Sequence, residues 1–144
     1  RKLKLDNFTI NTVTKLVEYQ NDINDVIEEN DISVREAIHK YGTDLLELMF
    51  VFAEADGRMK REYTGFNSRG RNVHLKTIKK LYDEILERGD CVDLKGLAVN
   101  GSDLMELGIV GEQIGETLNW LLHIVMENPA LNNKNTLISF VENR

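Results

Sequence analysis

The sequence predicts an all-α protein, and three observations support this fold class. Apolar residues recur at helical spacing in several segments, most regularly in residues 114–126. No segment alternates apolar and polar residues for long enough to form a strand, and no Asn-Gly or Asp-Gly pair lies between β-branched runs. Glycines and capping residues divide the chain at helical lengths. We therefore predict an irregular multi-helix bundle with a helix-hairpin-helix-like tail at its C-terminal end.

The 144 residues suffice for one hydrophobic core or for two small helical lobes. No apolar run approaches the roughly 20 residues that cross a bilayer, so we expect no membrane segment. The chain starts without methionine or an apolar leader, from which we expect a piece of a longer protein. Cys91 is the single cysteine, which excludes an internal disulfide and favours a cytoplasmic protein.

Charge is distributed unevenly along the chain, whose formal net charge is −6. Residues 56–80 contain eight basic and two acidic residues, a net charge of +6. The rest of the chain holds ten basic and 22 acidic residues, a net charge of −12. A basic segment inside an acidic chain indicates a local site for a polyanion.

Two helices are expected in the first 40 residues. Asn7 or Thr9 is a candidate N-cap for the first helix, which runs to about Gln20. Ser33 is a candidate N-cap for the second, with Glu36 at the capping-box position.

Thr43 begins the most apolar helix, and its apolar residues cover nearly the whole circumference. A helix of this kind is expected at the centre of the bundle. We expect Asp56 and Gly57 to end it. Residues 57–74 would then form a long basic surface loop, because three glycines interrupt this stretch.

Asn72 is a candidate N-cap for the next helix, which Gly89 would end. Three lysines are expected on the solvent side of this helix, opposite its apolar stripe. They are Lys76, Lys79 and Lys80, and the stripe comprises Ile78, Leu81, Tyr82, Ile85 and Leu86.

A helical hairpin is predicted near the C-terminal end. A short helix at residues 102–107 and the long helix that contains residues 114–126 flank a tight link from Gly108 to Gly111. Gly108 suits the left-handed position after a helix, and Pro129 would end the long helix.

A last helix is expected after the hairpin. Asn132 or Asn133 is its candidate N-cap, and Leu137, Ile138 and Val141 would face inward.

Three ordered segments resemble one protein family. They are LKLDNFTINTVTKLVEYQND (residues 3–22), YGTDLLELMFVFAEADGRMK (residues 41–60) and LAVNGSDLMELGIVGEQIGETLNWLL (residues 97–122). Together they are similar to the C-terminal region of bacterial tRNA nucleotidyltransferases, the CCA-adding and poly(A)-polymerase-like enzymes, in members with an HD-type insert.

The resemblance implies three regions. Residues 1–28 would end the preceding HD-like or neck region, residues 29–92 would form a helical body with the basic loop 57–74, and residues 93–144 would form the tail. The parent enzyme would transfer CMP and AMP from CTP and ATP to the 3′ end of tRNA. Magnesium and both nucleotides would bind in an N-terminal catalytic head, which lies outside this sequence and would be a partner of this region. No cofactor is expected here, and the fragment alone is not expected to be catalytic.

The task that the resemblance assigns to these residues is to hold tRNA by its shape and charge. The candidate RNA contacts are Arg58, Lys60, Arg61, Arg69, Arg71, Lys76, Lys79 and Lys80, with Tyr63, Phe66, Gly108 and Gly111 as second choices. The cations would neutralise phosphates, and the two aromatic rings would stack on exposed bases. The alternative is a solvated loop whose aromatic residues pack on its own helices.

The hairpin also has two interpretations. Amides of the Gly108–Gly111 link, at the start of a helix, would suit a phosphate. Alternatively, the hairpin only packs the tail. Glu112 favours packing, because it lies in the first turn, where family members often carry proline, and repels phosphate.

No catalytic or metal residue is predicted. Asp22 and Asp25 are spaced like a carboxylate pair but suit a solvated surface in so acidic a chain, and His39, His74 and His123 lack neighbouring ligands. Family members often read Tyr-His-Asp where this chain has Tyr19-Gln20-Asn21, so an inherited metal site is not expected.

A different class of function remains open. The chain could be a non-catalytic helical module that binds a protein, from an HD-type phosphohydrolase or a degenerate paralogue. A homodimer is also compatible with the sequence.

Overall fold

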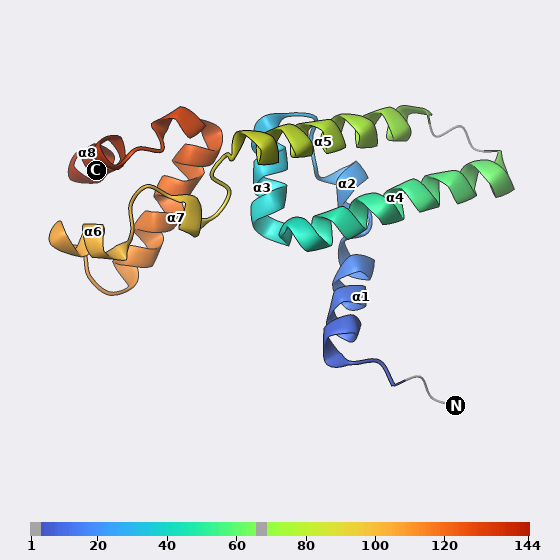
Figure 1. Ribbon diagram of the computed structural model, residues 1–144, viewed down its shortest axis with the longest axis horizontal. Coiled ribbons are helices and arrows are strands. Elements are labelled where there is room, and N and C mark those ends of the chain that lie inside the picture. Colours follow the sequence, from blue (N-terminus) through green and yellow to red (C-terminus); the bar gives the residue numbers. More distant parts are fainter. Residues whose placement is uncertain (1–3, 66–68) are drawn as a thin grey trace. The chain divides into compact units, whose positions relative to one another are not determined.

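A computed structural model describes residues 4–65 and 69–144 (Figure 1). These residues form helices and turns without a strand, which confirms the all-α prediction. The elements are α1 (Asn7–Tyr19), α2 (Asp22–Asp25), α3 (Asp31–Tyr41), α4 (Thr43–Thr64), α5 (Arg69–Arg88), the 3-10 turn η1 (Leu94–Gly96), α6 (Gly101–Glu106), α7 (Glu112–Glu127), the 3-10 turn η2 (Pro129–Leu131) and α8 (Lys134–Glu142).

The chain divides into two compact units, Arg1–Glu84 and Ile85–Arg144, and each has a hydrophobic core. We call them the first and the second unit. In the first unit, fully buried apolar side chains come from α2, α3, α4 and α5: Ile23, Val34, Leu46, Met49 and Ile78.

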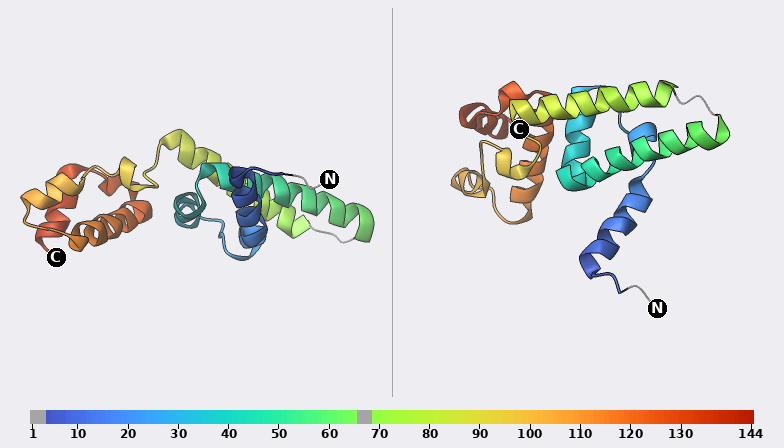
Figure 2. Two further views of the ribbon diagram at one scale, coloured as in Figure 1. Left: turned by 90° about the horizontal axis from the view of Figure 1, so that it is seen from below. Right: turned by 45° about the vertical axis from the view of Figure 1, so that its right-hand side comes forward.

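Helices α4 and α5 lie side by side and run in opposite directions (Figures 1 and 2). Lys79 Nζ donates to Glu54 Oε1 at 2.8 Å, and Tyr82 Oη donates to Glu47 Oε1 at 2.8 Å. From the first bond to the second, the residue number increases on α5 and decreases on α4, so the two helices are antiparallel. Gly57 allows a close approach here, because a Cβ atom at that position would lie 3.2 Å from Asn72 Oδ1.

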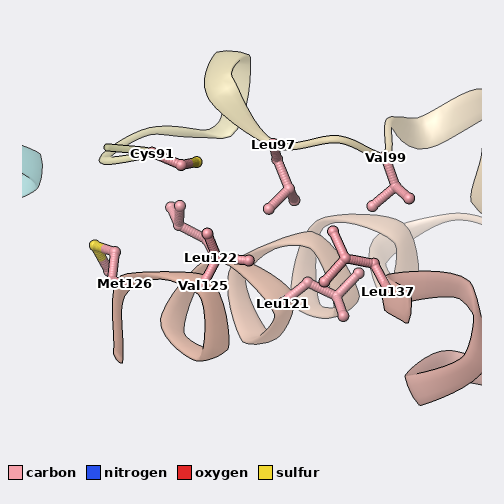
Figure 3. Close-up of a cluster of buried hydrophobic side chains, with 8 residues drawn as sticks. All are labelled: Cys91, Leu97, Val99, Leu121, Leu122, Val125, Met126 and Leu137. Carbon is pink, nitrogen blue, oxygen red and sulfur yellow. The ribbon is translucent and has the colours of Figure 1, made fainter. Parts of the chain in front are cut away.

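The second unit is built around α7. Its buried side chains pack against the extended segment before α6 and against α8 (Figure 3). The cluster comprises Cys91, Leu97, Val99, Leu121, Leu122, Val125, Met126 and Leu137. This matches the apolar stripe expected for the long helix of the hairpin.

Asparagine and aspartate side chains fix the loops of the second unit. Asn100 and Asp103 form a capping box at the start of α6. Asn132 accepts from Ala98 N at 2.8 Å and donates to Gly96 O at 2.9 Å. Lys134 Nζ lies 2.6 Å from Asp103 Oδ1 and ties α8 to α6.

Two predicted N-caps are wrong by a few residues. Asp6, rather than Asn7 or Thr9, caps α1, because its carboxylate accepts from Thr9 N at 2.8 Å. Asn30, rather than Ser33, caps α3 and accepts from Ser33 N at 2.8 Å. In both places several capping residue types are adjacent, and only the one with extended backbone geometry can serve.

The predicted loop over residues 57–74 is also wrong. Helix α4 continues through Gly57 to Thr64, and α5 already includes Arg69, so Asn72 lies inside a helix and is not its N-cap. A glycine inside a helix costs only about 1 kcal/mol. Contacts along the helix oppose this cost, since Lys60 pairs with Asp56 at 2.8 Å and Arg61 Nε donates to Gly57 O at 3.3 Å.

Helix α4 does not lie at the centre of a bundle, contrary to the prediction. Its buried side chains are Leu46, Met49 and Phe50, whereas Val51 is 64% exposed. Neighbouring helices therefore cover one face of α4 and leave another apolar face in solvent.

Other local predictions are confirmed. Gly89 and Gly108 follow helices at positive φ, 68° and 84°. Asn133 caps α8 by accepting from Thr136 N at 2.9 Å.

Candidate nucleic-acid interface

The basic residues lie on two helices rather than on a loop. We define the basic helical pair as residues 56–64 of α4 and residues 69–80 of α5. Because the helices are antiparallel, Arg58 and Arg61 of α4 come close to Lys76 of α5, and together they line an open hollow of about 230 Å³. Glu54, Asn72 and Leu75 complete its wall. We call it the basic hollow.

Several of these cations form no close ion pair within the described residues. Arg58, Arg71 and Lys76 are exposed and form no ion pair with any residue that the structure describes. Among the described residues, Arg61 binds only the backbone carbonyl of Gly57. Exposed cations without a close ion pair hold mobile counterions, which a polyanion can displace.

The remaining lysines are paired. Lys60 binds Asp56, Lys79 binds Glu54, and Lys80 lies 3.6 Å from Glu84 Oε1. The hydrogen bond from Lys79, assisted by the charge of Arg58, lowers the pKa of the Glu54 carboxyl. Glu54 therefore stays ionised, and it is the acidic residue among the described residues that line the basic hollow.

Lys60 and Arg71 line a second space, which Asn24, Asp56 and Gly57 also line. This space is small, with a volume of about 20 Å³. The predicted basic contacts thus separate into two groups, and the group of Arg58, Arg61 and Lys76 surrounds the larger opening.

The aromatic and terminal members of the predicted set differ in what the structure describes. Tyr63 is 79% exposed on α4, as base stacking would require. Arg69 is exposed at the start of α5. Phe66 lies outside the described residues.

The hairpin glycines belong to the second unit. Gly108 N donates to Met105 O at 2.9 Å, and Ile109 N donates to Leu104 O at 3.1 Å. This pair of bonds is a Schellman motif, which uses the Gly108 amide to end α6. Gly111 adopts φ 64° before α7, and its role in binding phosphate stays a prediction.

Sequence reasoning missed three residues near the basic helical pair. Glu54 lines the hollow. Its position one helical turn before Arg58 was the one signal in the sequence that could have indicated this role. Asn72 touches both spaces but was interpreted as a cap. His74 contacts two groups of the N-terminal segment, a tertiary relation without a local signal.

No metal or membrane feature is found in the described residues. They contain no group of three or more His, Cys, Asp or Glu side chains that could hold a metal ion. Asp22 accepts a hydrogen bond from Tyr41 and lies 3.7 Å from Lys40 Nζ. Among the described helices, none has the length and hydropathy of a membrane span.

Comparison with known proteins gives one result. A search of curated proteins and a search of solved structures each gave no match to this chain. The family model of tRNA nucleotidyltransferase domain 2 matches residues 1–141, nearly the whole chain. The chain therefore belongs to the tRNA nucleotidyltransferase domain 2 family, in agreement with the resemblance of its three sequence segments.

Proposed function

We propose that this chain binds tRNA through the basic helical pair and is part of an enzyme that adds CCA to tRNA 3′ ends. The observation that carries the proposal is the cluster of Arg58, Arg61 and Lys76 around one open hollow, without ion pairs to these three residues in the described structure. Membership of the tRNA nucleotidyltransferase domain 2 family supports tRNA as the polyanion.

The charge distribution supports a localised contact. Outside residues 56–80 the chain carries a net charge of −12, which repels a phosphate backbone. RNA would thus be held at the basic helical pair, where phosphates displace counterions from the arginines and lysine. Such contacts position an RNA without reading its sequence.

The chemical step is assigned to another region. In this proposal an N-terminal head of the parent protein binds magnesium, CTP and ATP and transfers the nucleotides. The present chain holds the tRNA at a fixed distance from that head. The parent enzyme is expected to act in the cytoplasm.

The proposal is tested by fluorescence anisotropy with a labelled tRNA that lacks its terminal CCA, at low and moderate salt. The variant of the basic hollow, which we call the hollow variant, is Arg58→Glu/Arg61→Glu/Lys76→Glu. A matched control, Lys4→Glu/Lys15→Glu/Lys95→Glu, changes the net charge equally at exposed lysines outside the basic helical pair.

We expect the unmutated chain and the control to bind tRNA with similar affinity. The hollow variant should bind at least about tenfold more weakly, and the slope of log affinity against log salt should fall by about 1 for each lost phosphate contact. Equal weakening in both variants would show that only net charge matters and would refute the assignment to the hollow.

A second candidate function has an observation in its favour. Helix α1 has no buried residue, and Phe8 and Val17 are 80% and 60% exposed. Such a surface suits a helical protein-interaction module. Absence of tRNA binding by the unmutated chain at low salt would favour this alternative.

A further inference from the structure

Helix α4 carries an exposed apolar stripe on a face that does not contact α5. Its members recur at i, i+4, i+7, i+11 and i+15, a spacing that puts side chains on one side of a helix. We call this stripe the α4 seam, and it comprises Leu48, Phe52, Ala55, Met59 and Tyr63, all of them exposed. The residues through which α4 contacts α5 lie on a different face of the helix, and they include Glu47, Glu54 and Gly57.

The length of the α4 seam indicates a binding surface. From residue 48 to residue 63 it extends over roughly 24 Å of helix. Single exposed apolar residues are common in soluble proteins, whereas a continuous exposed apolar strip marks an interaction surface. Its first four members are separated by four, three and four residues, as in the seam between two packed helices. The partner is therefore expected to present a helix.

An open hollow of about 390 Å³ lies at the N-terminal end of the seam, where α1 meets the start of α4 (Figure 1). We call it the α1–α4 hollow. It is lined by Phe8, Thr12 and Lys15 of α1 and by Tyr41, Gly42, Thr43, Asp44, Leu45 and Leu48. A cavity of about 150 Å³ already binds benzene, so this hollow has room for an aromatic ring.

Tyr63 presents such a ring at the other end of the seam, where its side chain is 79% exposed. Roughly 22 Å of helix separate it from Leu48 at the hollow, so it cannot enter the hollow of its own chain. An exposed ring at one end of a seam and a hollow at the other end are complementary between two copies that lie in opposite directions.

The charges on α4 favour the same direction. Residues 43–56 carry four acidic residues and no basic residue, whereas residues 58–64 carry three basic residues and one acidic residue. Antiparallel pairing of two α4 helices places the acidic half of one against the basic half of the other, whereas parallel pairing would place like charges together. The charge pattern thus fits a second copy of this helix, in antiparallel orientation.

The midpoint of the seam suits such a pair. Antiparallel helices that match Tyr63 with Leu48 cross near Ala55, whose small side chain allows a close approach. Asp56 lies beside the crossing point, where two copies would bring like charges together. Lys60 of the same chain compensates it at 2.8 Å.

We propose that the α4 seam binds a second copy of this chain in a two-fold symmetric, antiparallel helix pair that crosses near Ala55. Tyr63 of each copy lies in the α1–α4 hollow of the other copy, so this ring serves the interface and not base stacking. The basic hollow lies between α4 and α5, and each copy keeps it for RNA. The dimer does not rest on the proposed function.

Sedimentation equilibrium tests the dimer. The average mass of the unmutated chain should rise from one chain toward two chains between about 1 and 100 µM. The seam variant Ala55→Glu/Met59→Glu should have the mass of one chain throughout, because it places charges in the interface. The control Val73→Glu/Val110→Glu adds the same charge at exposed apolar residues outside the seam and should behave as the unmutated chain. Circular dichroism checks that all three are folded.

Two results would overturn the proposal. One is the mass of a single chain for the unmutated protein at every concentration, which would leave the seam for a different partner. The other is equal association of the unmutated chain and the folded seam variant, which would place the interface elsewhere.

A cysteine cross-link tests the crossing point without adding charge. Oxidised glutathione, which takes up the two electrons, should join the two thiols introduced by Ala55→Cys into a disulfide dimer. Val73→Cys, on the exposed surface of α5, is the control and should give little dimer. Cys91 is buried and is present in both variants. Equal dimer yields in both variants would refute a crossing near Ala55.

Tyr63→Ala tests the α1–α4 hollow. It should raise the dissociation constant of the dimer at least about fivefold, because an aromatic anchor in a pocket contributes strongly to an interface. An unchanged dissociation constant would refute the placement of Tyr63 in the hollow of the second copy.

Discussion

The two units use their polar side chains differently. In the second unit, Asn100, Asn132 and Asn133 bind backbone groups, and Asp103 binds both the Asn100 amide and Lys134. In the basic helical pair of the first unit, Lys60 and Lys79 are paired, whereas Arg71 and Lys76 form no ion pair with a residue that the structure describes. Polar groups with internal partners explain the local structure, whereas exposed cations without an ion pair are the groups on which the proposed RNA contact depends.

The largest effect is expected from the core of the second unit. Leu121 is fully buried within its cluster, and Leu121→Ala should lower the free energy of unfolding by about 2–5 kcal/mol because it removes packed methyl groups and leaves a cavity. Hydrogen exchange should show lost protection in residues 85–144, while tRNA binding by the first unit is retained below the melting temperature. Equal loss of protection in both units would show that they unfold together and would break the comparison.

An intermediate effect concerns acid stability. The Lys134 ammonium, together with the Asn100 amide, holds the pKa of Asp103 below its usual value. A carboxyl whose pKa is lower in the folded state stabilises the fold above its unfolded pKa, and this contribution is lost as pH falls through the folded value.

Thermal melts from about pH 5 downward measure this contribution. Below about pH 4, the melting temperature of the unmutated chain should decrease more steeply than that of Asp103→Asn, which has no carboxyl group to titrate at this position. Parallel curves would mean that the Asp103–Lys134 pair adds no pH-dependent stability.

The smallest effect on stability is expected at Glu54. The Glu54–Lys79 pair is about 40% exposed on both sides, so Glu54→Gln should change the free energy of unfolding by less than about 1 kcal/mol. It should strengthen tRNA binding roughly threefold, because it removes the acidic group from the basic hollow and releases Lys79. Glu116→Gln on α7 is the charge-matched control and should leave the affinity unchanged. Weaker binding by Glu54→Gln would show that Glu54 orients Lys79 for RNA.

Much of the fold was predictable because helical periodicity is a property of the sequence. The stripe of α7, the left-handed Gly108 and the cap at Asn133 all depend on neighbours within a few residues. The caps at Asp6 and Asn30 were missed because adjacent residues offer the same capping chemistry. Exposure of Val51 was not predictable either, since it depends on which helices cover α4.

For the candidate site, the charge count located the basic segment but not its geometry. Glycines at 57, 65 and 70 predicted a loop, yet only Gly65, at φ 62°, ends a helix. Arg58 and Lys76 line the same hollow because α4 and α5 pack antiparallel. The contact of His74 with Glu29 spans 45 residues of sequence. No local pattern contains such information.

The side chain of Asn132 has a further consequence for the extended segment before α6. Its amide binds Gly96 O and Ala98 N, the two backbone groups through which a neighbouring strand would pair. One side-chain amide thus binds a backbone donor and a backbone acceptor on either side of Leu97, and it ties the end of η1 to the residue that follows η2, more than 30 residues further along the chain.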